Sequence, residues 1–391
     1  MDINFHYYAV KTLAIYAGFT EKESQIIANY SQFVDDFTLY KNIILDDVPL
    51  IARHLAIKEK NKWVFCPVTT GFESWFDMAR LITLENQKKI TIPFHFIPPH
   101  CQLNKVKHGD ERIEWRVVPA KLATESLIQI LMLDARNKYQ ANPSADENLI
   151  RIGLLLHIFA DTYAHQMFSG FQGWENYCML TQCFDQVNNK DVIKDYRPNF
   201  YHTLPAIGHT EANHAPDDSN LYFIIKMKRN EKDDYSIIYQ RSNSIEFGIA
   251  AKEIIDYLRS CRRMTPMSDK DWNILKERFY DGFRTDQKNT IALNMHWKKF
   301  FPDINYDYDK NRLMSRLLER LPESDSLTKE ACTLIELLSR HGIEVDTALY
   351  EVKSMEFFHY NVIAAEIRNF VNGQNVSIEE LSSLENALNE E

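Results

Sequence analysis

Residues 157–170 of this 391-residue chain read HIFADTYAHQMFSG, and this stretch says most about the fold. Three side chains that can bind a metal, His157, Asp161 and His165, recur every fourth residue in an otherwise apolar run. An α-helix advances about 100° per residue, so each step of four residues drifts by only about 40° and the three side chains form one stripe. The sequence therefore predicts a helix over residues 147–170 with a polar stripe along one face.

The polar stripe allows two interpretations. In the first, other helices of the protein satisfy these polar groups by hydrogen bonding. In the second, the stripe binds a metal ion, because two imidazoles and a carboxylate are a ligand set that suits Zn²⁺. An unpaired buried polar group costs about 1–3 kcal/mol, and three of them in strict spacing favour the metal interpretation.

Apolar periodicity predicts helices over most of the chain, and glycine is scarce, with 11 residues. Residues 88–101 are expected to be extended because of their β-branched residues and proline cluster. The predicted elements are helices at 6–19, 20–36, 72–82, 118–137 and 147–170, short strands within 46–71, a β-hairpin at 220–241, a helical pattern from Ser244 onward, and C-terminal helices at 312–321, 326–342 and 352–371. We therefore predict a mainly α fold, a multi-helix bundle with a small β-hairpin and a C-terminal helical bundle. Its parts are a metal-binding helical domain at 1–311 and a helical region at 312–391, whose acidic tail frays.

The composition excludes several classes of protein. Lys and Arg total 45 and Asp and Glu total 55, and the net charge of −10 argues against non-specific binding to nucleic acid. No apolar run of about 18 residues occurs, so no transmembrane helix is expected. The six cysteines form no C-x-x-C pair and the N-terminus lacks a secretory pattern. We expect a protein that is cytoplasmic in the producing cell, or one exported without a cleaved signal peptide.

Further candidate ligands lie in three other segments. The first two are the N-terminal helix, which carries His6, and the end of the next helix, where Asp35 and Asp36 are adjacent. Adjacent acids at a helix C-terminus are disfavoured by the helix dipole unless a cation compensates them. The third is the loop PAIGHTEANHAPDD at 205–218, which offers His209, His214, Asp217 and Asp218 and could equally be a solvated surface turn.

Common catalytic motifs are missing from the chain. It contains no H-E-x-x-H helix, no G-x-S-x-G elbow, no P-loop and no G-x-G-x-x-G. The His and Asp residues are therefore the only groups in the sequence that together suggest a catalytic site.

The segments around these residues resemble a bacterial family of uncharacterised function, DUF6765. The resemblance rests on FHYYA, SQFVDD, PFHFIPP, GLLLHIFADTYAHQMFSG and LPAIGHTEANHAPD, and it spans roughly residues 4–300. More distantly, the ligand order resembles that of zinc-dependent phospholipase C and the S1/P1 nucleases, which are helical enzymes with up to three zinc ions. This resemblance implies a ligand set of His6, Asp35 or Asp36, His157, Asp161, His165, and His209 with Asp217, plus a middle His from His95 or His54.

The predicted function is a zinc-dependent hydrolase of phosphoesters that holds one to three ions, with other divalent metals as alternatives. Asp161 is expected to bridge ions, and Asp36 or Asp217 would act as general base if it stays off the metal. The substrate could be a phospholipid, a nucleotide or another phosphoester. The alternative function is a metal-stabilised helical scaffold or bacterial effector that binds a protein partner through the C-terminal helices without turnover.

Overall fold

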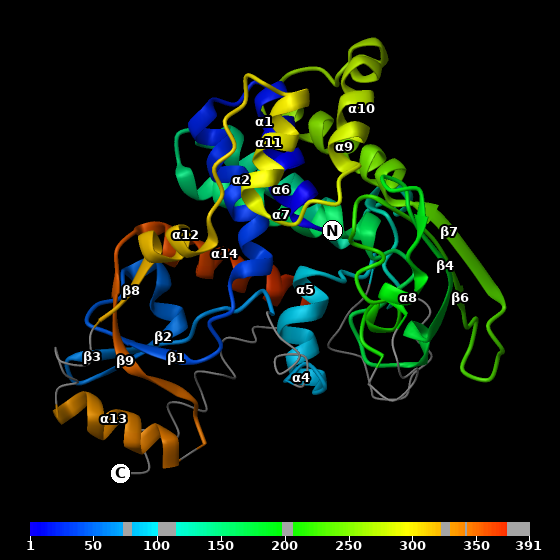
Figure 1. The fold of residues 1–391 in the computed structure, drawn as a ribbon. Helices are drawn as coiled ribbons and strands as arrows, with labels where there is room; N and C mark the ends of the chain where they lie inside the picture. The colour runs from blue at the N-terminus through cyan, green and yellow to red at the C-terminus, as the bar shows by residue number, and fades with distance from the viewer. Residues whose placement is uncertain (73–79, 101–114, 198–205, 322–328, 341, 374–391) are drawn as a thin grey trace. The chain divides into compact units, whose positions relative to one another are not determined.

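The computed structural model describes residues 1–72, 80–100, 115–197, 206–321, 329–340 and 342–373. The chain divides into two compact units (Figure 1). The first unit comprises Met1–Val34 and Ser74–Tyr308, and the second comprises Asp35–Glu73 and Asp309–Glu391. The second unit is therefore not the C-terminal region alone, because it also includes a segment close to the N-terminus.

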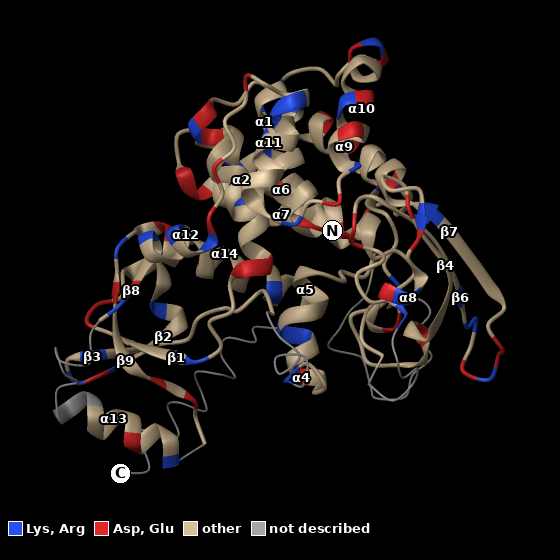
Figure 2. Ribbon diagram, in the orientation of Figure 1, with Lys and Arg blue, Asp and Glu red and all other residues tan. Residues whose placement is uncertain are grey.

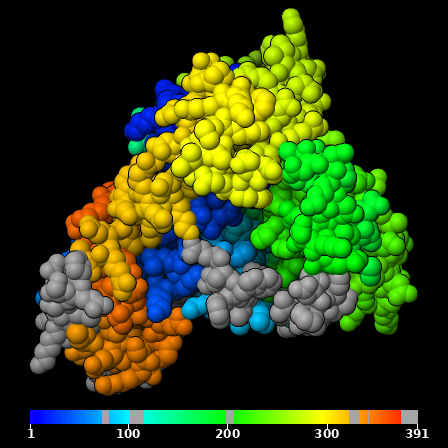
Figure 3. Space-filling view, viewed as in Figure 1, coloured from blue at the N-terminus to red at the C-terminus, as the bar shows by residue number. Residues whose placement is uncertain are grey.

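The first unit is built around one central helix, α7 (Asp146–Ala164). Every residue of α7 from Asn148 onward is buried except Arg151, because its side chains are apolar on all faces apart from the polar stripe. The helices that accompany it are the π-helical turn η1 (Asn4–Ala9) with α1 (Val10–Tyr16), α2 (Glu21–Asp36), α6 (Leu127–Ala141), α9 (Asn243–Cys261), α10 (Asp269–Phe283) and α11 (Thr290–Phe300). In the space-filling view the yellow segment around residue 300 covers much of the N-terminal helices (Figure 3).

Residues 88–101 do not form the extended segment that the sequence predicts. The short helices α4 (Leu84–Asn86), η3 (Gln87–Thr91) and α5 (Ile92–Phe94) follow one another without a break. The side chain of Thr83 caps this run by accepting a hydrogen bond from the backbone N–H of Asn86. Pro93 is the second residue of α5 and lies at the end of this run, so the proline ends the run and does not prevent it from forming.

The first unit also contains a four-stranded antiparallel sheet. Its strands are β5 (Lys190–Asp191), β4 (Cys178–Asp185), β6 (Leu221–Met227) and β7 (Ile237–Ser242), in that order. The hairpin of β6 and β7 confirms the predicted hairpin, but β4 and β5 extend it into a sheet. One face of the sheet is apolar and buried, with Phe223, Ile225 and Leu180 in its core. Short helical turns complete this unit: η6 (Ala120–Leu122), η7 (Trp174–Asn176), α8 (Ile193–Tyr196) and η8 (Thr210–Ala212).

The second unit has a five-stranded sheet in the order β2, β3, β1, β9, β8. The strands are β1 (Asn42–Leu45), β2 (Ala56–Glu59), β3 (Lys62–Phe65), β8 (Leu318–Arg320) and β9 (Val345–Val352), and only β1 and β9 pair in parallel. Its helices are η2 (Leu50–Leu55), α12 (Lys310–Leu317), α13 (Lys329–Arg340) and α14 (Met355–Asn372).

The predicted fold class is therefore wrong. The structure is 53% helical and 14% strand, and its two multi-strand sheets make it a mixture of α and β rather than a mainly α bundle. The three C-terminal helices exist, but β8 and β9 lie between them in the chain and join a sheet, so they do not form a helical bundle. The residues predicted to form helix 72–82 lie mostly outside the described residues, and the predicted fraying of the tail after residue 373 lies wholly outside them.

Charges of both signs are interspersed along the outer helices, for example on α10 (Figure 2). Within the described part of the chain, no helix is long and apolar enough to cross a lipid bilayer.

Candidate metal centre

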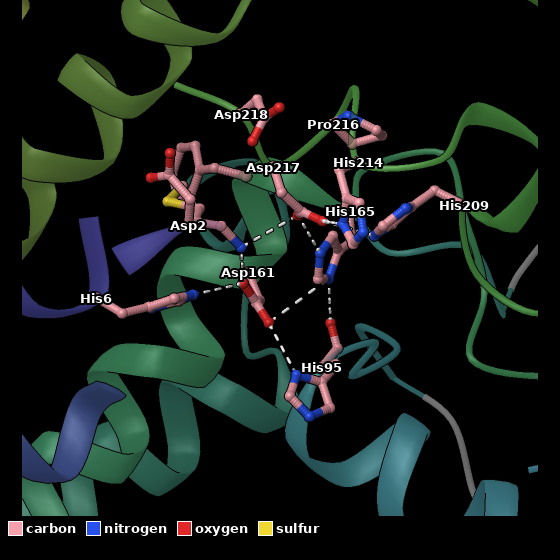
Figure 4. A network of polar contacts seen from close by, with 12 residues as sticks. Asp2, His6, His95, Asp161, His165, His209, His214, Pro216, Asp217 and Asp218 are labelled. Atoms are coloured by element: carbon pink, nitrogen blue, oxygen red, sulfur yellow. Dashed lines mark hydrogen bonds and ion pairs between the residues drawn. The ribbon is translucent and has the colours of Figure 1, made fainter. Parts of the chain in front are cut away.

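Helix α7 holds the predicted polar stripe at its C-terminal end (Figure 4). His157 and Asp161 lie within the helix, and His165 is the residue that caps it. All three side chains are buried. Burial of a carboxylate and two imidazoles in an apolar core requires strong partners for each of them.

His95, His157 and Asp161 form what we call the inner cluster. The Oδ2 atom of Asp161 lies 3.3 Å from Nδ1 of His95 and 3.2 Å from Nε2 of His157, and these two nitrogens are 3.3 Å apart. An ion with tetrahedral ligands at about 2.0 Å places those ligands about 3.3 Å from one another. The three atoms therefore have the separations expected for one face of a tetrahedral zinc site.

His165, His209 and Asp217 form what we call the outer cluster. Asp217 contacts Nε2 of His165 through Oδ1 at 2.9 Å and Nε2 of His209 through Oδ2 at 3.1 Å. The side chains of His209 and Asp217 are 16% and 15% exposed, whereas His157 and Asp161 of the inner cluster are 0% and 1% exposed. Solvent therefore reaches the outer cluster and not the inner one.

Three of the four imidazoles in these clusters have their ring orientation fixed by a backbone carbonyl. The contacts are His157 Nδ1 to Ser31 O at 2.9 Å, His165 Nδ1 to His95 O at 2.6 Å, and His209 Nδ1 to Asn213 O at 2.6 Å. A carbonyl oxygen only accepts hydrogen bonds, so each Nδ1 carries a proton and each Nε2 faces a carboxylate. Lone pairs of a nitrogen and a carboxylate oxygen that face each other need a cation between them, either a proton or a metal ion.

The electrostatics of the centre favour ionised carboxylates and disfavour a charged His165. Burial lowers the pKa of His165, although the carboxylates of Asp161 and Asp217 act in the opposite direction. Burial acts to raise the pKa values of Asp161 and Asp217, but the cationic groups around them hold both pKa values well below the usual range. One of these groups is the amine of Met1, which lies 2.5 Å from Oδ1 of Asp161 and 3.3 Å from Oδ1 of Asp217. Both carboxylates are therefore charged at neutral pH.

His6 extends the inner cluster from the opposite side of Asp161. Its Nε2 lies 3.2 Å from Oδ1 of Asp161, and its ring stacks on His157 with centroids 3.8 Å apart. Burial, followed by the charge of His157, holds the pKa of His6 well below its usual value. Neither ring nitrogen of His6 has a hydrogen-bond partner among the described residues, and His6 lies in a π-helical turn, a feature frequent at functional sites. A buried imidazole that faces a carboxylate suits a metal ligand.

Gly153 on α7 explains how α2 comes close enough to support His157. A Cβ atom at Gly153 would lie 2.5 Å from the carbonyl oxygen of Ile27, so only glycine permits this approach of the two helices. Ser31 lies one turn beyond Ile27 on α2, and His157 lies one turn beyond Gly153 on α7. The close crossing at Gly153 therefore brings the Ser31 carbonyl within reach of the His157 ring.

The structure brings together most of the predicted ligands: His6, His157, Asp161, His165, His209 and Asp217. Asp35 and Asp36 are the last residues of α2 and belong to the second unit, so their predicted roles as ligand or base stay predictions. His54, an alternative for the middle histidine, is exposed in the second unit, and His95 takes that place.

Three groups near the clusters differ from the expectations. His95 is one of two alternatives for the middle histidine, and the structure places it in the inner cluster. The Met1 amine is not among the predicted ligands, but it contacts Asp161 and Asp217. Asp218, offered by the same loop as Asp217, turns away and accepts hydrogen bonds from Tyr196 and from Lys288.

The fold and this buried His/Asp centre define a two-unit α/β protein with a candidate site for metal ions. A sequence profile of DUF6765, described as a family of unknown function, matches residues 1–374, and the chain belongs to that family. No curated protein matches the chain, and no solved structure matches it. The more distant relation to zinc-dependent phospholipase C and the S1/P1 nucleases stays a prediction.

Proposed function

We propose that this protein is a metal-dependent hydrolase of phosphoesters, with zinc as the expected metal. The observation that carries the proposal is the set of carbonyl-fixed imidazoles, which aim Nε2 lone pairs at ionised carboxylates in both clusters. Neutral imidazole nitrogens combined with carboxylate oxygens are a ligand set typical of Zn²⁺. A bound zinc ion would supply an activated water at neutral pH and would polarise a phosphoryl oxygen.

The two clusters suit different roles. The inner cluster has no exposure through His157 or Asp161, so it suits a closed position without an exchangeable ligand. The outer cluster is partly exposed through His209 and Asp217, so it suits the position that a water and a substrate would approach. Asp161 contributes Oδ2 to the inner cluster and turns Oδ1 to His6, which suits the bridging role predicted for it. The contacts of Asp217 with two imidazoles suit a ligand better than a free general base.

The alternative function is a scaffold or effector that binds metal for stability and a partner protein without turnover. The deep burial of the inner cluster favours this alternative, because a closed site contributes to folding whether or not chemistry takes place. The two functions differ in what the outer cluster does, and not in whether the inner cluster binds an ion.

Elemental analysis of protein purified without added metal tests the shared premise. We expect at least one equivalent of a transition metal, and a melting temperature that falls after chelation and recovers with zinc. Less than one equivalent of any such metal, with no rise in melting temperature on adding zinc, would overturn the proposal.

A panel of phosphomonoesters, phosphodiesters and phospholipids then separates the hydrolase from the scaffold. His209→Ala should lose one bound ion and most of the activity while the fold is retained. His157→Ala should lose the inner ion and the stability that it provides. His296→Ala is the matched control, because His296 contacts the carbonyls of Asp281 and Gly282 and the ring of Phe300, none of which belongs to the clusters. A loaded protein that hydrolyses none of the panel, or whose activity survives His209→Ala, would contradict the assignment.

A further inference from the structure

Arg241 is a buried cation that lies between the two elements carrying the candidate ligands. It belongs to β7 and is only 5% exposed. Its Nη1 donates to the carbonyl of Tyr163 at 2.6 Å, its Nη2 donates to the carbonyl of Pro216 at 2.6 Å, and its Nε donates to Oδ1 of Asn243 at 2.8 Å. Its guanidinium also lies over the ring of Phe223. All three nitrogens of the guanidinium are therefore engaged.

The two carbonyls that Arg241 contacts lie within two residues of candidate ligands. Tyr163 lies between Asp161 and His165 on α7, and Pro216 immediately precedes Asp217. One side chain thus joins the end of α7 to the loop that supplies Asp217.

Asn243 strengthens the same connection. Its Nδ2 donates to the carbonyl of Ala215 at 2.7 Å and to the carbonyl of Asp218 at 2.8 Å. The carbonyls on both sides of Asp217 are therefore held by Asn243 and Arg241, and Arg241 is itself oriented by Asn243.

The chemistry of Arg241 is unusual for a residue that serves only packing. Within the described residues no carboxylate lies at ion-pair distance from its guanidinium, so the charge is balanced by backbone carbonyls, the Asn243 amide and the face of the Phe223 ring. A buried charge without a carboxylate partner is costly, and only a planar fork of donors reaches two carbonyls and an amide at once. The position at the C-terminus of α7 offsets part of this cost, because the helix dipole there is negative.

We infer that Arg241 is a positioning residue for the metal centre, which sets the separation of Asp217 from Asp161 and His165. This inference rests on the proposed metal site and deepens it. Replacing Arg241 should weaken metal binding without removing any ligand. Loss of a residue that orients metal ligands commonly weakens metal affinity by about 10- to 100-fold.

Arg116 provides a matched control for this inference. It is equally buried, at 5% exposure, and its guanidinium also donates to backbone carbonyls, those of Glu175 and Lys228. Neither carbonyl adjoins a residue of the clusters. Loss of Arg116 should therefore lower the stability of the fold as loss of Arg241 does, but it should leave the metal centre unchanged.

The test compares full-length Arg241→Lys and Arg241→Met with Arg116→Lys and Arg116→Met. Zinc affinity is measured by chelator competition, the number of bound ions by elemental analysis, and the melting temperature on the metal-free protein. We expect an affinity about 10- to 100-fold weaker for at least one ion in both Arg241 variants, and wild-type affinity in both Arg116 variants at a similar loss of melting temperature. Arg241→Lys should be the less affected of the two Arg241 variants.

Two results overturn the inference: wild-type zinc affinity in the Arg241 variants, or an equal loss of affinity in the Arg116 variants. If the Arg241 variants do not fold, the Asn243→Ser variant is tested instead, because it removes the donors to the carbonyls of Ala215 and Asp218. Wild-type zinc affinity in Asn243→Ser would also overturn the inference. A wild-type protein that binds no zinc would instead contradict the proposed metal site, so the two failures are distinguishable.

Discussion

Replacement of Gly153 by alanine should weaken metal binding by displacing helix α2, which contributes no ligand to the two clusters. The new Cβ would lie 2.5 Å from the carbonyl oxygen of Ile27, 3.1 Å from Cβ of Tyr30 and 3.2 Å from the backbone nitrogen of Ser31. These are two backbone atoms and one Cβ atom of α2, so no side-chain rotation can relieve the contact. Helix α2 must therefore move away from α7.

The size of the movement follows from ordinary contact distances. Restoring the closest contact to 3.4 Å requires a shift of about 0.9 Å. The same shift would stretch the hydrogen bond from His157 Nδ1 to the Ser31 carbonyl from 2.9 Å to about 3.8 Å, which is too long for a hydrogen bond. The His157 ring would then lose the contact that fixes its proton on Nδ1.

The expected energies separate this effect from simple destabilisation. Overpacking costs about 1–3 kcal/mol, and the better helix propensity of alanine returns about 1 kcal/mol, so the free energy of unfolding should fall by about 0–2 kcal/mol. Zinc affinity should fall by about 10- to 100-fold, which corresponds to about 1.4–2.7 kcal/mol.

Denaturant unfolding of the metal-free protein and chelator competition measure the two quantities. Gly282→Ala on α10 is the control, since its Cβ would lie 3.0 Å from ring atoms of Trp297 and that contact involves no residue of the clusters. Gly282→Ala should lose stability and keep wild-type affinity. A Gly153→Ala protein that binds zinc with wild-type affinity would show that the Ser31 carbonyl does not support His157 as a ligand.

Three further outcomes are expected. Zinc at 100 times its dissociation constant should raise the free energy of unfolding by about 2.7 kcal/mol per site, and excess chelator should abolish the rise in a thermal unfolding scan. Burial acts to raise the pKa of Asp185, but hydrogen bonds from Asn188 and from the backbone N–H of Val187 lower it. The ionised carboxylate therefore stabilises the fold above its unfolded pKa of about 3.9, and this contribution is lost as the pH falls through the lower folded pKa. Asp185→Asn should lower the melting temperature at pH 7. A difference in melting temperature between wild type and variant that does not narrow in acid would refute this. Asn213 has φ 51° and ψ −138°, a conformation that favours glycine, and its carbonyl holds His209. Asn213→Gly should therefore keep zinc affinity while Asn213→Ala loses about 1 kcal/mol of stability and part of the affinity, and equal behaviour of the two variants would contradict the reasoning.

The polar stripe of α7 could be predicted from the sequence because it depends only on local spacing. The repeat of His157, Asp161 and His165 fixes the face on which these residues lie once the segment is helical. The hairpin of β6 and β7 could be predicted for the same reason, since its strands are adjacent in the chain. Features that depend on distant segments could not be predicted in this way.

The sheet of the second unit shows this limit. Strand β1 has only four residues, which is too few to show the alternation of apolar and polar residues that identifies a strand. Its parallel partner β9 pairs Val345 with Asn42, more than 300 positions away in the chain. Strand β9 lies between the amphipathic helices α13 and α14, whose longer apolar periods dominate this part of the sequence. The prediction of a helical bundle therefore failed where short strands join a sheet through long-range pairing.

The supporting contacts of the metal centre were beyond prediction for a different reason. Each is made by a backbone carbonyl, of Ser31, His95 or Asn213, and a carbonyl has no residue type that could reveal it. The histidines alone leave open which nitrogen binds a metal, and hence whether a ring can serve as a ligand at all. The carbonyls decide this, because they place the proton on Nδ1 and leave Nε2 free to coordinate. The case for a metal centre therefore depends more on these backbone positions, which only the fold determines, than on the number of histidines in the sequence.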